Sequence, residues 1–353
     1  MDAGFGILLP IMNNYTRLLQ VFFGICTMAV ICGCNTVRGP QYEDGFVGFD
    51  GKVSKVSQGE YYILRFEYPG EFITDNPRWM NGNQRWNFVE VRQLKDGITV
   101  VEDGKLRKDN WRKAGLNWQR WLKPGSRNVR IKFVDERYSI ADANFDPTPD
   151  GFEPLFNGRD LAGWKGVTRE ENFHMPKVRK AATPEKRKEM QAKADKQMRE
   201  HWFVRDGVLF FDGLEGGYSL ATAKDYRDFE LIADWRLLRV LGDSGLYLRG
   251  MPQIQIWDPN LWAGIGSGGI YNNATALSNA TTCEDRPIGE WNRFRIRMVG
   301  NRVSVWLNGV KVVDDVEYEN TRDKGEPLPT IEQIELQCHG DPIEFRNLYI
   351  KEL

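Results

Sequence analysis

Residues 243–258, DSGLYLRGMPQIQIWD, combine a strand pattern with side chains that can bind and react. In both halves of this stretch, leucine or isoleucine alternates with a polar or aromatic residue: Tyr247, Arg249, Gln253, Gln255 and Trp257. A period of two predicts strands with one apolar face and one polar, aromatic face. An ordinary solvent-facing strand would carry Lys, Glu and Thr, so this face indicates a surface that binds a ligand.

Other predicted strands show the same division between an apolar and a polar face. Their polar positions add Asp234, Arg236, Gln337, His339, Glu344 and Arg346. Adjacent sugar hydroxyls donate and accept together and pair well with amides, carboxylates and guanidinium groups. The aromatic rings offer a surface for the C–H face of a sugar. We therefore expect a carbohydrate surface if the strands are neighbours, although Arg249 with Asp258, or Glu344 with Arg346, could instead be internal ion pairs.

A glycine-rich stretch, GIGSGGIYNN at 264–273, follows these strands. Its glycines allow the backbone to approach a ligand closely, and Tyr271 and Asn272 would face the same site. The stretch lacks the Lys-Ser/Thr ending and the helix of a phosphate loop, so no nucleotide cofactor is expected.

His339 is the histidine that we select as a candidate for proton transfer, because it ends a strand on the polar face. A divalent metal is also an open alternative, with Asp234, Asp258, Glu344 and His339 as available ligands of undecided spacing. No nucleophile-elbow sequence supports a serine triad. Cys283 and Cys338 are interpreted as ordinary buried residues, and whether they pair is left open.

The N-terminus has the pattern of a secretory signal. Arg17 precedes an apolar run over 18–31 and the sequence ICGC. This run is too short for a comfortable membrane span. It resembles a bacterial lipoprotein signal with Cys34 as the lipidated residue, which predicts a signal at 1–34, a tether at 35–45 and a lipid anchor at the bacterial cell envelope, periplasmic or outer membrane. An uncleaved anchor helix is the alternative.

The rest of the chain reads as all-β. Alternating runs over 46–142 predict a small β-sandwich with a weak resemblance to galactose-binding-like domains, and 143–151 reads as a linker. A second β-rich region follows over 152–353, interrupted by a helix at about 183–200. The interpretations of this helix are a solvated surface helix docked by a narrow stripe (Met190, Ala194, Met198), or a lid beside the site. The net charge of −1 argues against nucleic acid as a partner.

Six motifs in order resemble one family: FEPLFNGRDLAGWKG, WFVRDGVLFFDG, DSGLYLRGMPQIQIWD, GSGGIYNN, GEWNRFRIRMVGNRVSVWLNG and IELQCHGDPIEFRNLYIKEL. This is the 3-keto-disaccharide hydrolase family, also described as 3-keto-glucoside 1,2-lyase and 3-keto-2-hydroxy-glucal hydratase. The resemblance covers about 150–353. It implies a concanavalin A-like jelly-roll sandwich, to which the smaller sandwich and the inserted helix are additions.

The resemblance also implies a reaction on an oligosaccharide or glycoside that a separate sugar 3-dehydrogenase has oxidised. A base removes the C2 proton, the aglycone leaves C1, and water adds to the product. We expect His339 as the base, with Asp258 or Glu344 as second choice, and Arg249 with Gln255 at the enolate oxygen. These groups should line a common hollow. The alternatives are a non-catalytic carbohydrate-binding lipoprotein and an ordinary glycoside hydrolase.

Overall fold

The computed structural model describes most of the chain after residue 138 and several segments before it. The described residues are 47–48, 61–69, 86–95, 97–106, 126–134, 137 and 139–353, without 215–217, 250–252, 274–277 and 321–325. The predicted signal at 1–34, Cys34 and the tether at 35–45 lie outside them, so these stay predictions. Among the described helices, none has the length and apolar character needed to cross a membrane.

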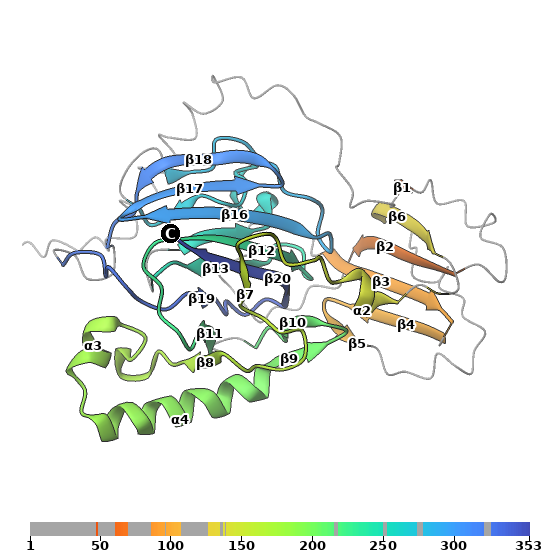
Figure 1. Cartoon of the computed structure of the whole chain (residues 1–353). Helices are drawn as coiled ribbons and strands as arrows, with labels where there is room; N and C mark the ends of the chain where they lie inside the picture. Colours follow the sequence, from red (N-terminus) through yellow and green to blue (C-terminus); the bar gives the residue numbers. More distant parts are fainter. Residues whose placement is uncertain are drawn as a thin grey trace, which may run out of the picture. The chain divides into compact units, whose positions relative to one another are not determined.

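Two antiparallel sheets form a sandwich in the C-terminal region (Figure 1). The back sheet has the strand order β18 (Val310–Glu317), β17 (Arg302–Leu307), β16 (Asn292–Val299), β12 (Phe229–Leu237), β20 (Ile343–Glu352), β10 (Val208–Phe211) and β9 (Trp202–Arg205), with β7 (Glu153–Pro154) beside β20. The front sheet has the order β15 (Ile270–Tyr271), β14 (Gln253–Trp257), β13 (Asp243–Tyr247), β19 (Glu335–Leu336), β11 (Ser219–Thr222) and β8 (Trp164–Val167). The predicted all-β, jelly-roll class is confirmed.

The apolar faces of the two sheets meet in one core, as the alternation predicts. On β16 the buried residues are Phe294, Ile296 and Met298, and the arginines between them are exposed. Leu246 and Ile254 supply the facing side from the front sheet. Both described cysteines are free thiols: Cys338 is buried as expected, whereas Cys283 is exposed.

The inserted helix covers an edge of the front sheet. It is α4 (Pro184–His201), preceded by the short α3 (Pro176–Ala181), and its N-cap Thr183 accepts a hydrogen bond from the Lys186 amide at 3.2 Å. The predicted stripe of Met190, Ala194 and Met198 is buried. Figure 1 shows α4 running along β8 and β9, so the helix closes the side of the sandwich.

Side chains of α4 also pair with the outer edge of β8. The Gly166 amide donates to Asp195 Oδ1 at 2.9 Å, and Gln191 Nε2 donates to the Gly166 carbonyl at 3.0 Å. Unpaired edge groups would be a template for pairing with another chain. A Cβ at Gly166 would lie 2.2 Å from the Ala194 carbonyl oxygen, so glycine permits this close approach.

The N-terminal sheet is antiparallel, in the order β1 (Val47–Gly48), β6 (Arg127–Val134), β2 (Tyr61–Pro69), β3 (Trp86–Leu94), β4 (Gly97–Glu102) and β5 (Lys105–Leu106). Its small core contains Leu64, Phe66, Val89 and Val91. The short helix α2 (Ile140–Ala143) follows it. The division into domains at 46–142 and 152–353 stays a prediction.

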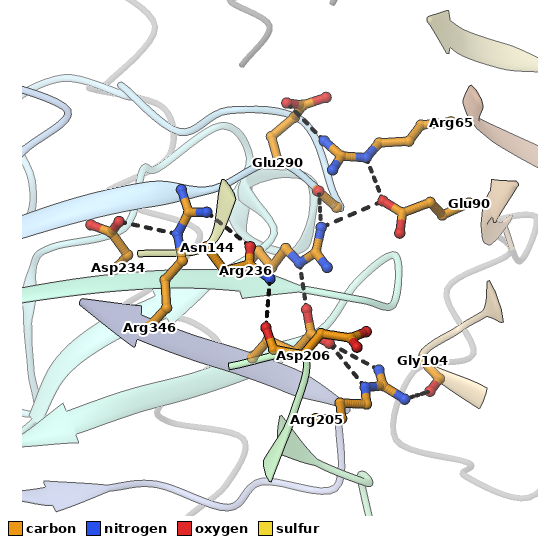
Figure 2. Close-up of polar contacts among 12 residues, drawn as sticks. Arg65, Glu90, Gly104, Asn144, Arg205, Asp206, Asp234, Arg236, Glu290 and Arg346 are labelled. Carbon is orange, nitrogen blue, oxygen red and sulfur yellow. Dashed lines mark hydrogen bonds and ion pairs between the residues drawn. The ribbon is translucent and has the colours of Figure 1, made fainter. Parts of the chain in front are cut away.

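A buried ion network joins the N-terminal sheet to the sandwich (Figure 2). Arg65 pairs with Glu90 at 2.6 Å and with Glu290 at 3.2 Å, and Arg236 pairs with Glu344 at 2.5 Å and with Glu90 at 3.5 Å. Burial alone would raise the pKa of Glu90, but the surrounding arginines hold it well below its usual range. The network is therefore charged, and it fixes the two parts by directional contacts.

The predicted linker lies along β20. The Asp146 amide donates to Asn347 Oδ1 at 3.0 Å, and the Tyr349 hydroxyl donates to the Asp146 carbonyl at 2.6 Å. Arg346 adds a hydrogen bond from Nη1 to the Ala143 carbonyl at 3.1 Å. The two prolines and two aspartates of the linker lie in no strand or helix. Hydrogen bonds nevertheless hold this segment to the back sheet.

Candidate active site

The outward face of the front sheet carries a row of polar and aromatic residues in register. Tyr247 on β13 lies between Glu335 on β19 and Gln253 on β14, and Gln253 is paired with Tyr271 on β15. On the other side, Ala221 on β11 is the cross-strand partner of both Glu335 on β19 and Lys165 on β8. The full row across the sheet is Lys165, Ala221, Glu335, Tyr247, Gln253 and Tyr271. Of the residues predicted for the polar face, Tyr247, Gln253 and Tyr271 therefore lie side by side on this sheet.

A second row places two carboxamides beside Gly245. Gln337 and Gln255 flank this glycine on the neighbouring strands. The Gln337 Nε2 group donates to the Tyr247 hydroxyl at 3.1 Å, while its Oε1 atom is buried and has no hydrogen-bond partner among the described residues. A Cβ at Gly245 would stand 3.2 Å from that oxygen, so the glycine makes room for the carboxamide. A buried acceptor without a partner costs stability, which favours a ligand donor there.

Asp243 and His339 form a titratable pair at the end of these rows. His339 Nδ1 lies 3.8 Å from Asp243 Oδ2, and the imidazole is 42% exposed. Gln255 Nε2 donates to Asp243 Oδ1 at 2.6 Å. Burial raises the pKa of Asp243 to about 6, against the lowering effect of His339 and the Gln255 hydrogen bond. A carboxyl with a raised pKa beside an accessible imidazole is suited to proton transfer.

Asp341 holds the backbone of Asp243 in place. Its Oδ2 atom accepts a hydrogen bond from the Asp243 amide at 3.0 Å, and its Oδ1 atom accepts one from Arg239 at 2.9 Å. The contact fixes the backbone from which the Asp243 side chain projects. Sequence reasoning selected neither aspartate. The sequence could have predicted that Asp243 lies on the polar face, because it shares the two-residue period of Gly245 and Tyr247.

An aromatic cluster stands next to Asp243. Trp257 is the cross-strand partner of Asp243, with its ring centroid 5.7 Å from that of Trp262 and 6.4 Å from that of Tyr271. Tyr271 is 43% exposed and Trp262 is 36% exposed, so part of the cluster is open to a ligand. Burial and the nearby Asp243 charge raise the pKa of the Tyr271 hydroxyl.

Arg249 does not reach this face. Its backbone is left-handed, with φ +50°, which ends the strand alternation after Tyr247. The guanidinium group donates to the carbonyls of Gly300 and Thr330, the latter at 3.0 Å. The contact with Gly300 anchors the turn between β16 and β17, so Arg249 has a structural position.

Asp258 also has a structural position. It follows the last residue of β14 and caps the short 3-10 helix η5 (Pro259–Trp262). One carboxylate oxygen accepts from the Asn260 amide at 3.0 Å, and the other accepts from the Leu241 amide at 2.9 Å. Such capping explains why an aspartate stands at this position.

Asp234 and Glu344 lie on the other sheet. They belong to β12 and β20, and both are held by arginines on the outward face of the back sheet. Asp234 pairs with Arg346 at 3.3 Å (Figure 2) and with Arg293 at 2.5 Å. Glu344 joins the buried ion network through Arg236. Asn272, another predicted ligand residue, is exposed in a turn with φ +67°. Alternation assigned each side chain to a face of its strand, but the sheet that each strand joins depends on tertiary structure.

The described residues contain no group of three or more His, Cys, Asp or Glu side chains that could hold a metal ion. The candidate ligands Asp258 and His339 lie at the front sheet, whereas Asp234 and Glu344 lie on the back sheet.

Comparison with known proteins identifies the family. The 3-keto-alpha-glucoside-1,2-lyase-like domain matches residues 151–351. The chain belongs to this family. The match covers the sandwich and its helix, leaves the N-terminal sheet outside, and agrees with the resemblance noted over 150–353.

Individual relatives are distant. A 3-keto-disaccharide hydrolase of Bacteroides thetaiotaomicron is 20% identical over 259 residues, which is 58% of this chain and 79% of that protein. A solved structure from Parabacteroides distasonis, described as a candidate glycosyl hydrolase, is 21% identical with a TM-score of 0.40 over 58% of this chain and 94% of that one. A second such protein from the same organism is 30% identical, with a TM-score of 0.36, over 44% of this chain and 91% of that one.

Proposed function

We propose that this protein cleaves 3-keto-glycosides by β-elimination on the polar face of the front sheet, with His339 and Asp243 as the acid-base pair. The observation that carries the proposal is the position of this pair, 3.8 Å apart, at the end of a face lined with glutamines and aromatic rings. The family and the name of the Bacteroides relative support the same substrate class. A glycoside-acting enzyme is the general form of this proposal, and elimination is its specific form.

The reaction requires a base at C2 of the sugar, because the neighbouring C3 ketone makes that proton acidic. Imidazole is an effective base near neutral pH, and the exposed side of His339 takes the C2 proton. The Asp243 carboxylate stabilises the imidazolium that forms. The C2–H electrons form an enolate, and its collapse expels the aglycone oxygen from C1 with its bonding pair. A proton then passes from the imidazolium to the aglycone oxygen.

Hydration of the product completes a net hydrolysis. Water adds across the C1–C2 double bond, with its oxygen at C1 and a proton at C2, and the ketone is retained. The Gln337 carboxamide can hold the sugar, because its nitrogen keeps a second hydrogen after bonding Tyr247 and its oxygen has no partner within the described part of the chain. The aromatic cluster of Trp257, Trp262 and Tyr271 offers a surface for the ring.

The test is release of p-nitrophenol from p-nitrophenyl 3-keto-glucoside, with the enone product followed by absorbance. We expect His339→Ala to lower kcat by about 10²–10⁴-fold, the usual contribution of a general base. Lys188→Ala, a change at an exposed position on α4, is the control and should retain activity within about twofold. Undiminished release by His339→Ala would show that His339 is not the base.

Parallel assays distinguish the alternatives. Ordinary p-nitrophenyl glucoside should not be cleaved, because its C2 proton is not acidified. Cleavage of both substrates would indicate an ordinary glycoside hydrolase, and binding without cleavage would indicate a carbohydrate-binding protein. Assays with and without a chelator test the contribution of a divalent metal.

The cellular context follows from the substrate as part of the same proposal. The C3 ketone must come from a separate sugar 3-dehydrogenase, since this reaction consumes a ketone and does not form one. The lipoprotein pattern ending at Cys34 would place the enzyme at the bacterial cell envelope. Labelling with a lipid precursor, compared between wild type and Cys34→Ser, tests this localisation.

A further inference from the structure

A cavity lies at the end of the sandwich that borders the N-terminal sheet; its lining does not include Asp243 or His339, and it shares Trp257 with the aromatic cluster. Its volume is about 250 Å³. Its walls come from β2 and β6 of the N-terminal sheet, from the ends of β12 and β14, and from the segment 285–292. At roughly 30 Å³ per water molecule, this volume equals about eight waters. A single sugar ring fits a space of this size.

Three lining residues carry buried polar atoms without a hydrogen-bond partner among the described residues. They are the donors Trp235 Nε1 and Arg286 Nε and the acceptor Asp285 Oδ1. Trp235 is only 2% exposed, so water outside the protein does not satisfy its indole N–H. Buried polar groups normally have partners, and three exceptions around one cavity indicate that a bound molecule supplies them.

The charges around the cavity favour a neutral ligand. The carboxylates of Glu67 and Glu290 are paired with Arg127 at 2.8 Å and with Arg130. Asp258 is occupied by backbone and side-chain amides. Arg286 and Asp285 add opposite charges to the lining, so no single sign of charge dominates around the cavity.

The unpaired atoms themselves define the chemistry of the ligand. A molecule that donates to Asp285 and accepts from Trp235 and Arg286 needs groups that do both, as neighbouring hydroxyls do. Asp285 Oδ2 already accepts from the Ser267 amide at 2.9 Å, which holds the carboxyl in place while Oδ1 remains available. Trp257 also lines the cavity and adds apolar surface.

We infer that this cavity is a second binding site, for one ring of a neutral polyhydroxylated molecule such as a monosaccharide or a cyclic polyol. The inference does not depend on the proposed elimination, because none of its three polar atoms belongs to the Asp243–His339 pair. The site would hold a sugar unit, or a released product, between residues of the sandwich and residues of the N-terminal sheet.

Isothermal titration of the full chain with D-glucose, D-galactose and myo-inositol tests the inference. We expect saturable binding of at least one probe, weakened about tenfold by Asp285→Asn and by Trp235→Phe, each of which removes a hydrogen bond. Asp285→Asn nearly preserves the shape of the side chain, so it remains informative if Trp235→Phe fails to fold.

Two controls locate the binding. Trp306→Phe changes a tryptophan that packs against Arg295 and Lys311 on the back sheet, and Gln337→Ala changes the polar face of the front sheet. Trp306→Phe should bind the probe as the wild type does, whereas Gln337→Ala, which alters the proposed substrate face, should leave the binding that depends on Asp285 in place. Absence of saturable binding to the folded wild type overturns the inference. So does binding that Asp285→Asn leaves unchanged or that only Gln337→Ala removes, and so does a crystal soaked in the probes that holds only water in the cavity.

Discussion

At the residue scale, Asp243 has opposing requirements for stability and for the proposed chemistry. Its folded-state pKa is raised to about 6, mainly by burial, from an ordinary value of about 3.9. Folding therefore favours the protonated form, and the stability that this form contributes is present at pH 4 and lost as the pH rises through about 6. The proposed reaction needs the charged form, because a carboxylate stabilises the imidazolium of His339. Such a conflict is typical of functional sites.

We predict that Asp243→Asn stabilises the protein while it reduces activity. Relative to wild type, the variant should gain about 1–3 kcal/mol of unfolding free energy on going from pH 4 to pH 8, because it cannot ionise. Its kcat/KM should fall most above about pH 6, where the wild-type carboxyl is charged, and the difference from wild type should narrow below that pH. Urea denaturation and elimination assays across this pH range measure both effects. Equal pH dependence of stability in the two proteins would contradict the raised pKa.

At the element scale, α4 substitutes for a neighbouring strand at the edge of the front sheet. Its apolar stripe closes the core, while Asp195 and Gln191 bond the amide and carbonyl of Gly166 on β8. The four-residue spacing in the sequence predicted the apolar stripe. The sequence did not decide between a surface helix and a lid. The contacts identify α4 as part of the sandwich wall, because its buried side is continuous with the core through Met198.

Gly166→Ala tests this packing, since the added methyl would meet the Ala194 carbonyl at 2.2 Å. We expect a loss of about 1–3 kcal/mol of unfolding free energy, as for other overpacked sites. The control is Lys188→Ala at an exposed position on α4, which should change stability by less than about 0.5 kcal/mol. A Gly166→Ala protein as stable as the control would mean that α4 does not pack closely on β8.

At the scale of the whole molecule, charged side chains connect the N-terminal sheet to the sandwich. Arg130 and Glu290 form a pair in which both side chains are 0% exposed, and Arg65 extends it to Glu90. Phe88 of β3 belongs to the sandwich core cluster and packs against Gly289, where a Cβ would meet its ring at 2.0 Å. The two parts therefore share buried contacts, and we expect them to unfold in a single transition.

Glu290→Gln should remove about 3–5 kcal/mol of unfolding free energy, because it leaves Arg130 as a buried charge without its partner. The matched control is Glu230→Gln, which breaks a pair with the half-exposed Arg295 and should cost less than about 1 kcal/mol. Circular dichroism and tryptophan fluorescence, followed through the same urea titration, show whether unfolding has one transition or two. Equal losses in the two variants, or two separated transitions, would contradict a shared buried network.

The sequence by itself determined the strands, the apolar faces, the helix and the family, because these depend on local periodicity and on motifs that are contiguous in the chain. It also identified Gln253, Gln255, Gln337 and His339 as members of a polar face. Only the tertiary structure decided which sheet each strand joins, and it places Asp234 and Glu344 on the back sheet. The left-handed backbone at Arg249 directs that side chain away from the polar face of the front sheet. The tertiary structure also places Asp243 beside His339 and raises the pKa of Asp243. Both effects arise only in the folded chain, because they depend on burial and on the proximity of residues distant in sequence.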